Sequence, residues 1–156
     1  MRVIVIDSNR QEVREAEVSS NAADLRELVG GWLTIAPVQW PGEHVLFVDD
    51  EGLFKPQKWF FRLAGNERPF AGNGVLVGPE KYNDEGDYIG TEDVAFTAAQ
   101  IARVVTFVSR AQADAWAKAT AHEAESTLTA GGVTTVLATR GQVWNNMPKP
   151  EEEEST

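Results

Sequence analysis

The sequence contains no cysteine, which excludes disulfide bonds, thiolate metal sites and cysteine nucleophiles. It also lacks any apolar run near the roughly 20 residues that a membrane-spanning helix needs. Residues 1–7 reach an acidic residue too early for the apolar core of a signal peptide. We therefore expect a soluble, cytoplasmic protein without a membrane partner.

Basic residues are in the minority. The chain has 14 Lys and Arg residues and 24 Asp and Glu residues, which gives a formal net charge of −10. Four of the acidic residues form the run at residues 151–154. An acidic surface repels the phosphate backbones of DNA and RNA, so direct nucleic-acid binding is not expected. The acidic balance leaves three interpretations: solubility, a basic protein partner, or mimicry of nucleic-acid charge.

The hydrophobic pattern predicts a single α+β domain with a mixed, mainly antiparallel sheet and two or three helices. Residues 3–6 form a β-branched run typical of a strand buried on both faces, and residues 12–18 complete an N-terminal hairpin. Asn21 and Gly30 mark the start and end of a short amphipathic helix. Segments 65–74 and 80–93 are rich in glycine or acidic residues and are predicted to be loops. Further strands are predicted at residues 32–36, 44–48, 75–77 and 104–108.

The domain is expected to span residues 1–145. Residues 1–108 form its body, and residues 109–145 form a C-terminal extension with a helix from residue 110 to about 127 and a last strand at 133–139. The spacing of Thr97 with Gln100, and of Ser109 with Gln112, fits the capping box that opens helices. Residues 146–156 are rich in proline and glutamate and are expected to be a disordered acidic tail.

No residue pattern requires catalysis, a metal or a cofactor, so we expect a non-enzymatic protein. The two histidines, His44 and His122, share no local spacing, and no serine lies in a nucleophile-elbow sequence. The sequence leaves open a triad or carboxylate site that is built from distant positions. The turn Gly72, Asn73 and Gly74 is a candidate small-ligand site, but a phosphate loop opens a helix and this turn precedes an apolar run.

Aromatic residues are crowded beside two arginines in the middle of the chain. Trp59, Phe60 and Phe61 are consecutive, and neighbouring side chains on a strand face opposite sides. They therefore belong either to a core with two sides or to a binding surface, because aromatics and arginine are enriched at interfaces. The candidate interaction surface consists of Trp59, Phe60, Phe61, Arg62, Arg68 and Phe70.

Three segments together resemble family 3846 among the domains of unknown function. They are residues 28–32 (LVGGW), 45–53 (VLFVDDEGL) and 69–79 (PFAGNGVLVGP), and the resemblance covers residues 1 to about 108. Members of that family occur mainly in bacteriophages, prophages and other mobile elements, and the resemblance supplies no catalytic residue. It implies a phage-type gene product that acts in the cytoplasm of an infected bacterium.

Our leading hypothesis is a phage-type accessory protein that binds a host macromolecule, in the first place a protein. The first alternative is a small-molecule binder, such as a sponge for nucleotide signals, with Arg62, Arg68 and Lys81 lining its pocket. The second alternative is an acidic mimic of nucleic acid, which requires acids along one continuous face. An edge strand of the N-terminal hairpin, or the alanine-faced helix after residue 110, offers a surface for a homodimer.

Overall fold

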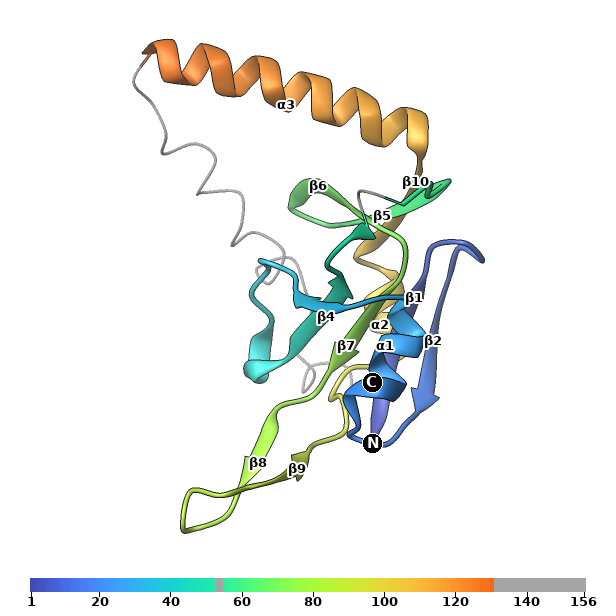
Figure 1. The fold of residues 1–156 in the computed structure, drawn as a ribbon, viewed down its shortest axis with the longest axis vertical. Coiled ribbons are helices and arrows are strands. Elements are labelled where there is room, and N and C mark those ends of the chain that lie inside the picture. Colours follow the sequence, from blue (N-terminus) through green and yellow to red (C-terminus); the bar gives the residue numbers. More distant parts are fainter. Residues whose placement is uncertain (53–54, 131–156) are drawn as a thin grey trace.

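The computed structural model describes residues 1–52 and 55–130, and within them the chain forms an α+β fold of three antiparallel sheets and three α-helices (Figure 1). The main sheet has the strand order β2-β1-β7-β4-β3. Its strands are β1 (Arg2–Asp7), β2 (Glu12–Glu17), β3 (Leu33–Ile35), β4 (Val45–Asp49) and β7 (Gly74–Val77).

The two faces of the main sheet bury two apolar clusters. On one face Val3 and Val5 of β1 pack with Leu25 and Val29 of α1 (Ala22–Val29). Side chains alternate along a strand, so Ile4 and Ile6 of β1 face the larger cluster on the opposite side. The prediction that this strand is buried on both faces is confirmed.

The larger cluster is covered by a second sheet of order β10-β5-β6 and by α2. These elements are β5 (Trp59–Leu63), β6 (Asn66–Ala71), β10 (Val105–Ser109) and α2 (Ala98–Ala102). The capping box of Thr97 and Gln100 opens α2 as predicted. A 3-10 turn, η1 (Pro41–Glu43), precedes β4.

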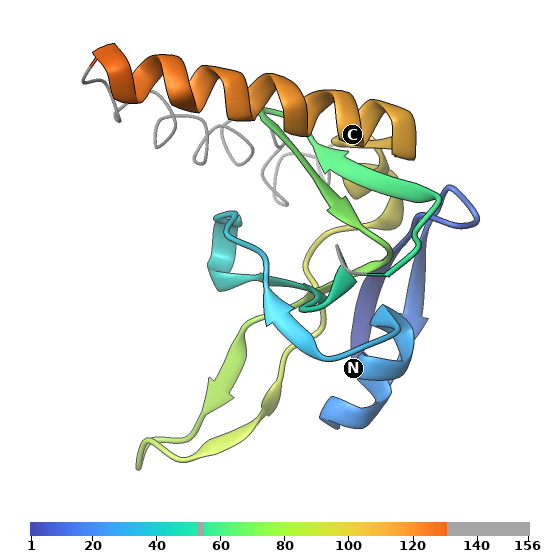
Figure 2. The same cartoon turned by 45° about the horizontal axis from the view of Figure 1, so that its top comes forward.

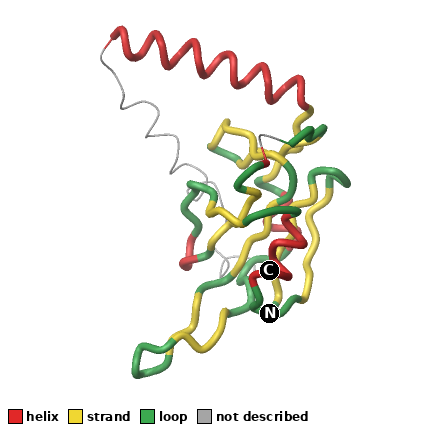
Figure 3. Tube along the Cα trace, viewed as in Figure 1, coloured by secondary structure: helices red, strands yellow, loops and turns green. Residues whose placement is uncertain are grey.

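Two segments predicted as loops are strands instead. Residues 65–74 contain β6, which lies at an edge of the second sheet, where a proline such as Pro69 is tolerated. Residues 80–93 contain β8 (Glu80–Tyr82) and β9 (Tyr88–Thr91), which form a separate two-stranded sheet. This hairpin has no buried face, so its sequence lacks the apolar alternation that reveals most strands. Figures 1 and 3 show it extending away from the body.

The C-terminal helix α3 (Arg110–Ala130) begins directly after β10 and runs along the second sheet (Figure 2). Ser109 and Gln112 form the predicted capping box: the N–H of each residue donates to the side chain of the other, at 2.8 and 3.3 Å. The predicted strand at 133–139, the predicted tail at 146–156 and the side chain of His122 lie outside the described residues. Within the described part, no helix is both long and apolar enough to cross a membrane.

Candidate functional site

The glycine and acidic motifs of the sequence meet at one end of the main sheet, which we call the polar junction. The Asp49 carboxylate at the end of β4 is buried and accepts from Lys55 Nζ at 2.6 Å and from the N–H of Glu51 at 3.0 Å. Lys55 Nζ also donates to the carbonyl of Gly30 at 3.0 Å. A Cβ at Gly31 would overlap the Asp49 carboxylate, so a residue without a side chain is required there.

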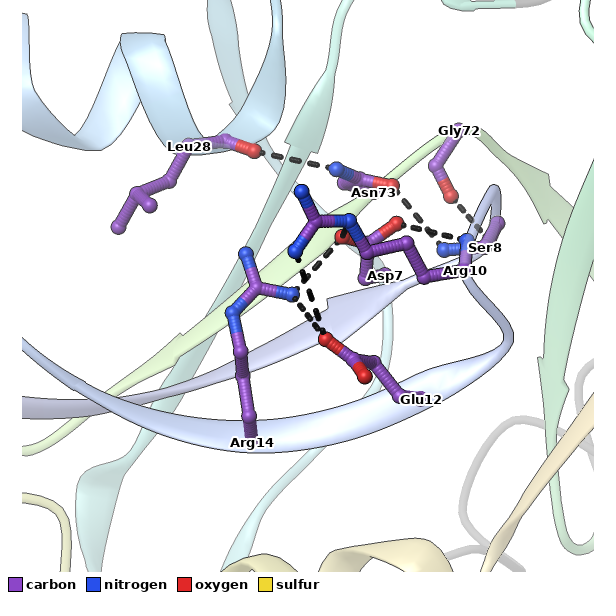
Figure 4. Close-up of polar contacts among 8 residues, drawn as sticks. All are labelled: Asp7, Ser8, Arg10, Glu12, Arg14, Leu28, Gly72 and Asn73. Atoms are coloured by element: carbon purple, nitrogen blue, oxygen red, sulfur yellow. Dashed lines mark hydrogen bonds and ion pairs between the residues drawn. The ribbon is translucent and has the colours of Figure 1, made fainter.

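The turn between β6 and β7 forms the other half of the polar junction (Figure 4). Asn73 accepts from the backbone N–H of Ser8 at 3.0 Å and donates to the carbonyl of Leu28 at 3.4 Å. The Ser8 hydroxyl donates to the carbonyl of Gly72. One amide side chain therefore joins the end of β1 to the last turn of α1.

A buried carboxylate, Asp7, stands beside this turn. It accepts from Arg14 Nη1 at 2.8 Å and from the backbone N–H of Arg10 at 3.1 Å, and Arg10 Nε lies 3.9 Å away. Burial alone would raise the pKa of Asp7, but the hydrogen bonds from Arg14 and Arg10 and their charges outweigh it and lower the pKa below 3.8. Asp7 therefore stays ionised at neutral pH.

The hydrogen bonds of the polar junction indicate that its polar groups have a structural role. The Asn73 amide, the Ser8 hydroxyl and the carboxylates of Asp7 and Asp49 all bond to other groups of the chain. The turn at Gly72 leads into the core strand β7, as predicted, and not into a helix. The Asn73 side chain offered for a small ligand is thus already bonded on both its oxygen and its nitrogen.

The predicted aromatic surface does not form, because three of its rings are buried. Phe61 and Phe70 stack at 5.4 Å between centroids inside the larger cluster. Phe60 points to the opposite face of β5 and packs against Val108 of β10 and Ala113 of α3. Both faces of β5 are covered, so the crowding of aromatics reflects a core with two sides.

The exposed arginines of that predicted surface lie in separate clefts. Arg62 lines a cleft of about 140 Å³ next to Trp116, whereas Arg68 lines one of about 310 Å³ between β3, β4 and β6. Lys81 belongs to the hairpin of β8 and β9. The three basic residues proposed to line one ligand pocket are therefore not brought together, and Trp59 is half-buried.

Exposed apolar side chains gather instead on residues 80–93, a segment that contains the hairpin of β8 and β9 and that we call the arm. Tyr82, Tyr88 and Ile89 are 56, 52 and 61% exposed. Tyr82 lies directly opposite Tyr88 across the two strands, and the rings meet edge to face at 6.0 Å between centroids. A register shift leaves Ile89 as the extra residue of a β-bulge, a feature that re-aims side chains.

The tyrosine hydroxyls are held by neighbours on the arm. Tyr82 donates to the Glu80 carboxylate, and the Tyr88 hydroxyl lies 2.7 Å from Oγ1 of Thr91. The hydrogen bond to Glu80, with smaller contributions from desolvation and neighbouring charges, raises the pKa of Tyr82 above 10.0. These contacts fix both rings on one face of the arm and leave the faces of the rings in solvent.

The tip and the base of the arm are both fixed. At the tip, the Asn83 side chain accepts from the N–H groups of Glu85 and Asp87 at 3.0 and 2.8 Å. At the base, the Asp93 carboxylate accepts from the N–H of Arg2 in β1 at 2.8 Å. The backbone of Gly78 lies so close to residues 92 and 93 that a Cβ would overlap it. The arm is therefore a preorganised projection of the body.

The arm is strongly acidic. Residues 80–93 contain six carboxylates against the single base Lys81, and the carboxylates are Glu80, Asp84, Glu85, Asp87, Glu92 and Asp93. Sequence reasoning assigned this stretch to a solvated loop and missed its tyrosines. The signal that identifies it is a run of turn-forming residues, 83–87, between two tyrosines, since this pattern is typical of a hairpin.

Comparison with known proteins identifies one family that the chain matches. The family model described as a domain of unknown function, DUF3846, matches residues 1–102. The chain belongs to this family. The part of the chain matched to DUF3846 includes both the polar junction and the arm, and it ends at the last residue of α2, before β10 and α3. The resemblance seen in the sequence is thereby confirmed. No curated protein and no solved structure matches the chain.

Proposed function

We propose that this DUF3846 protein is a non-enzymatic accessory protein that binds a partner protein through the arm. The observation that carries the proposal is the exposure of Tyr82, Tyr88 and Ile89 on a hairpin fixed at both ends. Rigid aromatic side chains lose little conformational entropy on binding and are enriched at interfaces. The phage-type context of the family leads us to propose a protein of the host bacterium as the partner.

The charge of the arm defines the chemistry of that partner. Six carboxylates beside two tyrosine rings favour a surface rich in Lys and Arg, because such cations pair with carboxylates and also stack on aromatic rings. The same charges repel a second arm, so the arm does not favour a symmetric dimer with itself. A partner with a basic surface therefore fits the arm better than another copy of the chain.

The distribution of acids supports a protein partner over mimicry of nucleic acid. Asp49 is buried and paired with Lys55 in the polar junction, so it cannot stand in for a phosphate. Strand β7 starts opposite Val48, beside the polar junction, and the arm follows its other end. Acids at the two ends of β7 do not form the continuous face that mimicry requires.

A capture experiment tests the proposal. The full-length protein is immobilised, exposed to bacterial lysate and compared with a variant carrying both Tyr82→Ser and Tyr88→Ser. We expect a bound protein that the double variant loses. Raising the salt from about 0.1 M to about 1 M shortens the Debye length from about 10 Å to about 3 Å, so the same protein should elute.

The control is Trp116→Ser, which removes a half-buried aromatic of α3 that lies outside the arm and outside the main sheet. It should retain the captured protein. Equal capture by the double variant and by the unchanged chain, with unchanged circular dichroism, would show that the arm is not the contact.

A further inference from the structure

The outer edge of β3 presents unpaired backbone groups. The carbonyl of Trp32 accepts from the N–H of Asp50, the residue after β4, at 2.8 Å, and the N–H of Ala36 donates to the carbonyl of Leu46 in β4 at 2.9 Å. Along an antiparallel strand, the backbone N–H and C=O groups of successive residues point alternately toward and away from the neighbouring strand. Those of Thr34 therefore point toward β4, whereas those of Leu33 and Ile35 point away from the sheet. No other described residue bonds to these outward groups.

This edge lacks the protection found at the opposite border of the main sheet. Strand β2 carries four charged side chains in six residues, which oppose pairing with another strand. Strand β3 has no charged side chain. Trp32, just before the strand, is 64% exposed, and Ile35, its last residue, is 61% exposed. An uncharged edge of this kind favours the addition of an extended segment from a partner.

A cleft of about 310 Å³ is lined by Thr34 and Ile35 of β3, and the exposed charged residues in its lining are Asp50 and Arg68. Asp50 donates its backbone N–H to the carbonyl of Trp32, the residue just before β3. Ala71 of β6 lies against Gly52, close to the start of β3. Arg68 lies three residues from Ala71 along extended β6, about 10 Å away. The apolar lining consists of Ile35, Ala36, Pro37, Val48, Pro69, Phe70 and Ala71.

The charged side chains of Asp50 and Arg68 are available to a ligand. The Arg68 guanidinium lies 5.8 Å from the centroid of the Phe70 ring and forms no ion pair with another described residue. Asp50 is exposed, while the neighbouring Asp49 is neutralised by Lys55. The cleft is therefore complementary to a segment with an acidic residue at one end and a basic residue at the other.

We propose that β3 and this cleft bind an extended segment of a partner protein, which adds to β3 as an antiparallel strand. An antiparallel segment begins beside Ile35 and ends beside Trp32. Its acidic residue therefore lies toward its amino terminus, near Arg68, and its basic residue lies toward its carboxyl terminus, near Asp50. An apolar side chain between them enters the cleft. This site is separate from the arm, and the proposal does not depend on the proposed function.

The first test measures binding by fluorescence anisotropy. The probe is a labelled octapeptide of alternating valine and threonine, with glutamate near its amino terminus and lysine near its carboxyl terminus. The control peptide has the two charged residues exchanged. We expect the probe to bind the full-length protein about tenfold more tightly than the control, the size of effect that one charge-assisted contact gives. Arg68→Gln should remove that difference, whereas Arg62→Gln, an exposed arginine outside this cleft, should leave it unchanged.

The second test follows backbone amides by hydrogen exchange. The Thr34 amide, which bonds to β4, should be protected with and without the probe. The Ile35 amide should exchange quickly in the free protein and slow at least about tenfold with the probe bound. Ile35→Pro removes that outward N–H while leaving the inward bonds of β3, so it should abolish binding; Ile35→Ala should only weaken it.

Several results would overturn the proposal. One is the absence of saturable binding by both peptides; another is tighter binding of the control peptide. Protection of the Ile35 amide in the free monomer would show that another part of the chain covers the edge. Protection that grows with protein concentration would show that a second copy does.

Discussion

The two ends of β7 use polar residues in opposite ways. At its start, the polar junction encloses Asp7, Asp49 and Asn73 in hydrogen bonds that join three strands to α1. Beyond its other end, the arm holds tyrosines and carboxylates in solvent. The sequence motifs that mark the family fall largely on the first end. They identify the fold, whereas the groups free to meet a partner lie on the second.

The largest effect is expected in the polar junction. Asp49→Ala removes the partner of Lys55 and the acceptor for the Glu51 N–H, and it leaves a void beneath Gly31. We expect a loss of about 3 kcal/mol in the free energy of unfolding, at the lower end for a broken buried pair because Lys55 can reach water. Urea unfolding monitored by circular dichroism measures it. The exposed neighbour supplies the control, since Asp50→Ala should change stability by less than about 0.5 kcal/mol.

Replacing an asparagine with alanine in the polar junction and in the arm compares what each contributes to stability. Asn73→Ala leaves the partly buried N–H of Ser8 without its acceptor and should cost about 1–2 kcal/mol of global stability. Asn83→Ala frees two N–H groups at the exposed tip of the arm, where water replaces the lost acceptor. It should loosen the tip and leave the urea midpoint nearly unchanged. Equal losses of stability in the two variants would contradict the division into a structural end and an exposed end.

A buried histidine makes the region beside the arm sensitive to pH. His44 Nε2 accepts from the N–H of Ala95 at 3.0 Å, and its Nδ1 lies 2.9 Å from the carbonyl of Pro41, so the ring is neutral and protonated on Nδ1. Burial lowers the pKa of His44 below 6.5, despite opposing contributions from the Pro41 and Gly42 backbone and from Glu92.

His44 should make the folded protein less stable at acidic pH. Below pH 6.5 the unfolded chain binds a proton at His44 that the folded chain does not, so stability falls as the pH drops toward the folded pKa. Melting temperatures measured from pH 7.5 to pH 5 should fall more steeply for the unchanged protein than for His44→Gln. The variant itself should cost about 1 kcal/mol at neutral pH through weakened hydrogen bonds. Parallel curves for the two proteins would show that His44 does not contribute.

The sequence predicted the elements that have local signals. Asn21 caps α1 and Gly30 ends it in the left-handed conformation, as expected from those two residues. The burial of the aromatic rings of β5 had no local signal, because it depends on β10, which pairs with β5 from more than 40 residues away. The polar junction was equally hidden, since Ser8 and Asn73 are 65 residues apart. Sequence patterns report short-range structure, whereas burial and junctions depend on which strands pair.

The smallest effect on stability, and the most informative for function, is expected on the arm. Tyr82→Ser with Tyr88→Ser removes two exposed rings that pack on each other, so the free energy of unfolding should change by less than about 0.5 kcal/mol. Tyrosine fluorescence quenching should confirm that both rings meet solvent in the unchanged protein. A loss above about 2 kcal/mol would instead mean that the arm supports the body. Unchanged stability combined with lost capture of a partner would separate the two ends of β7 in one variant, because only a binding surface can lose its partner without loosening the fold.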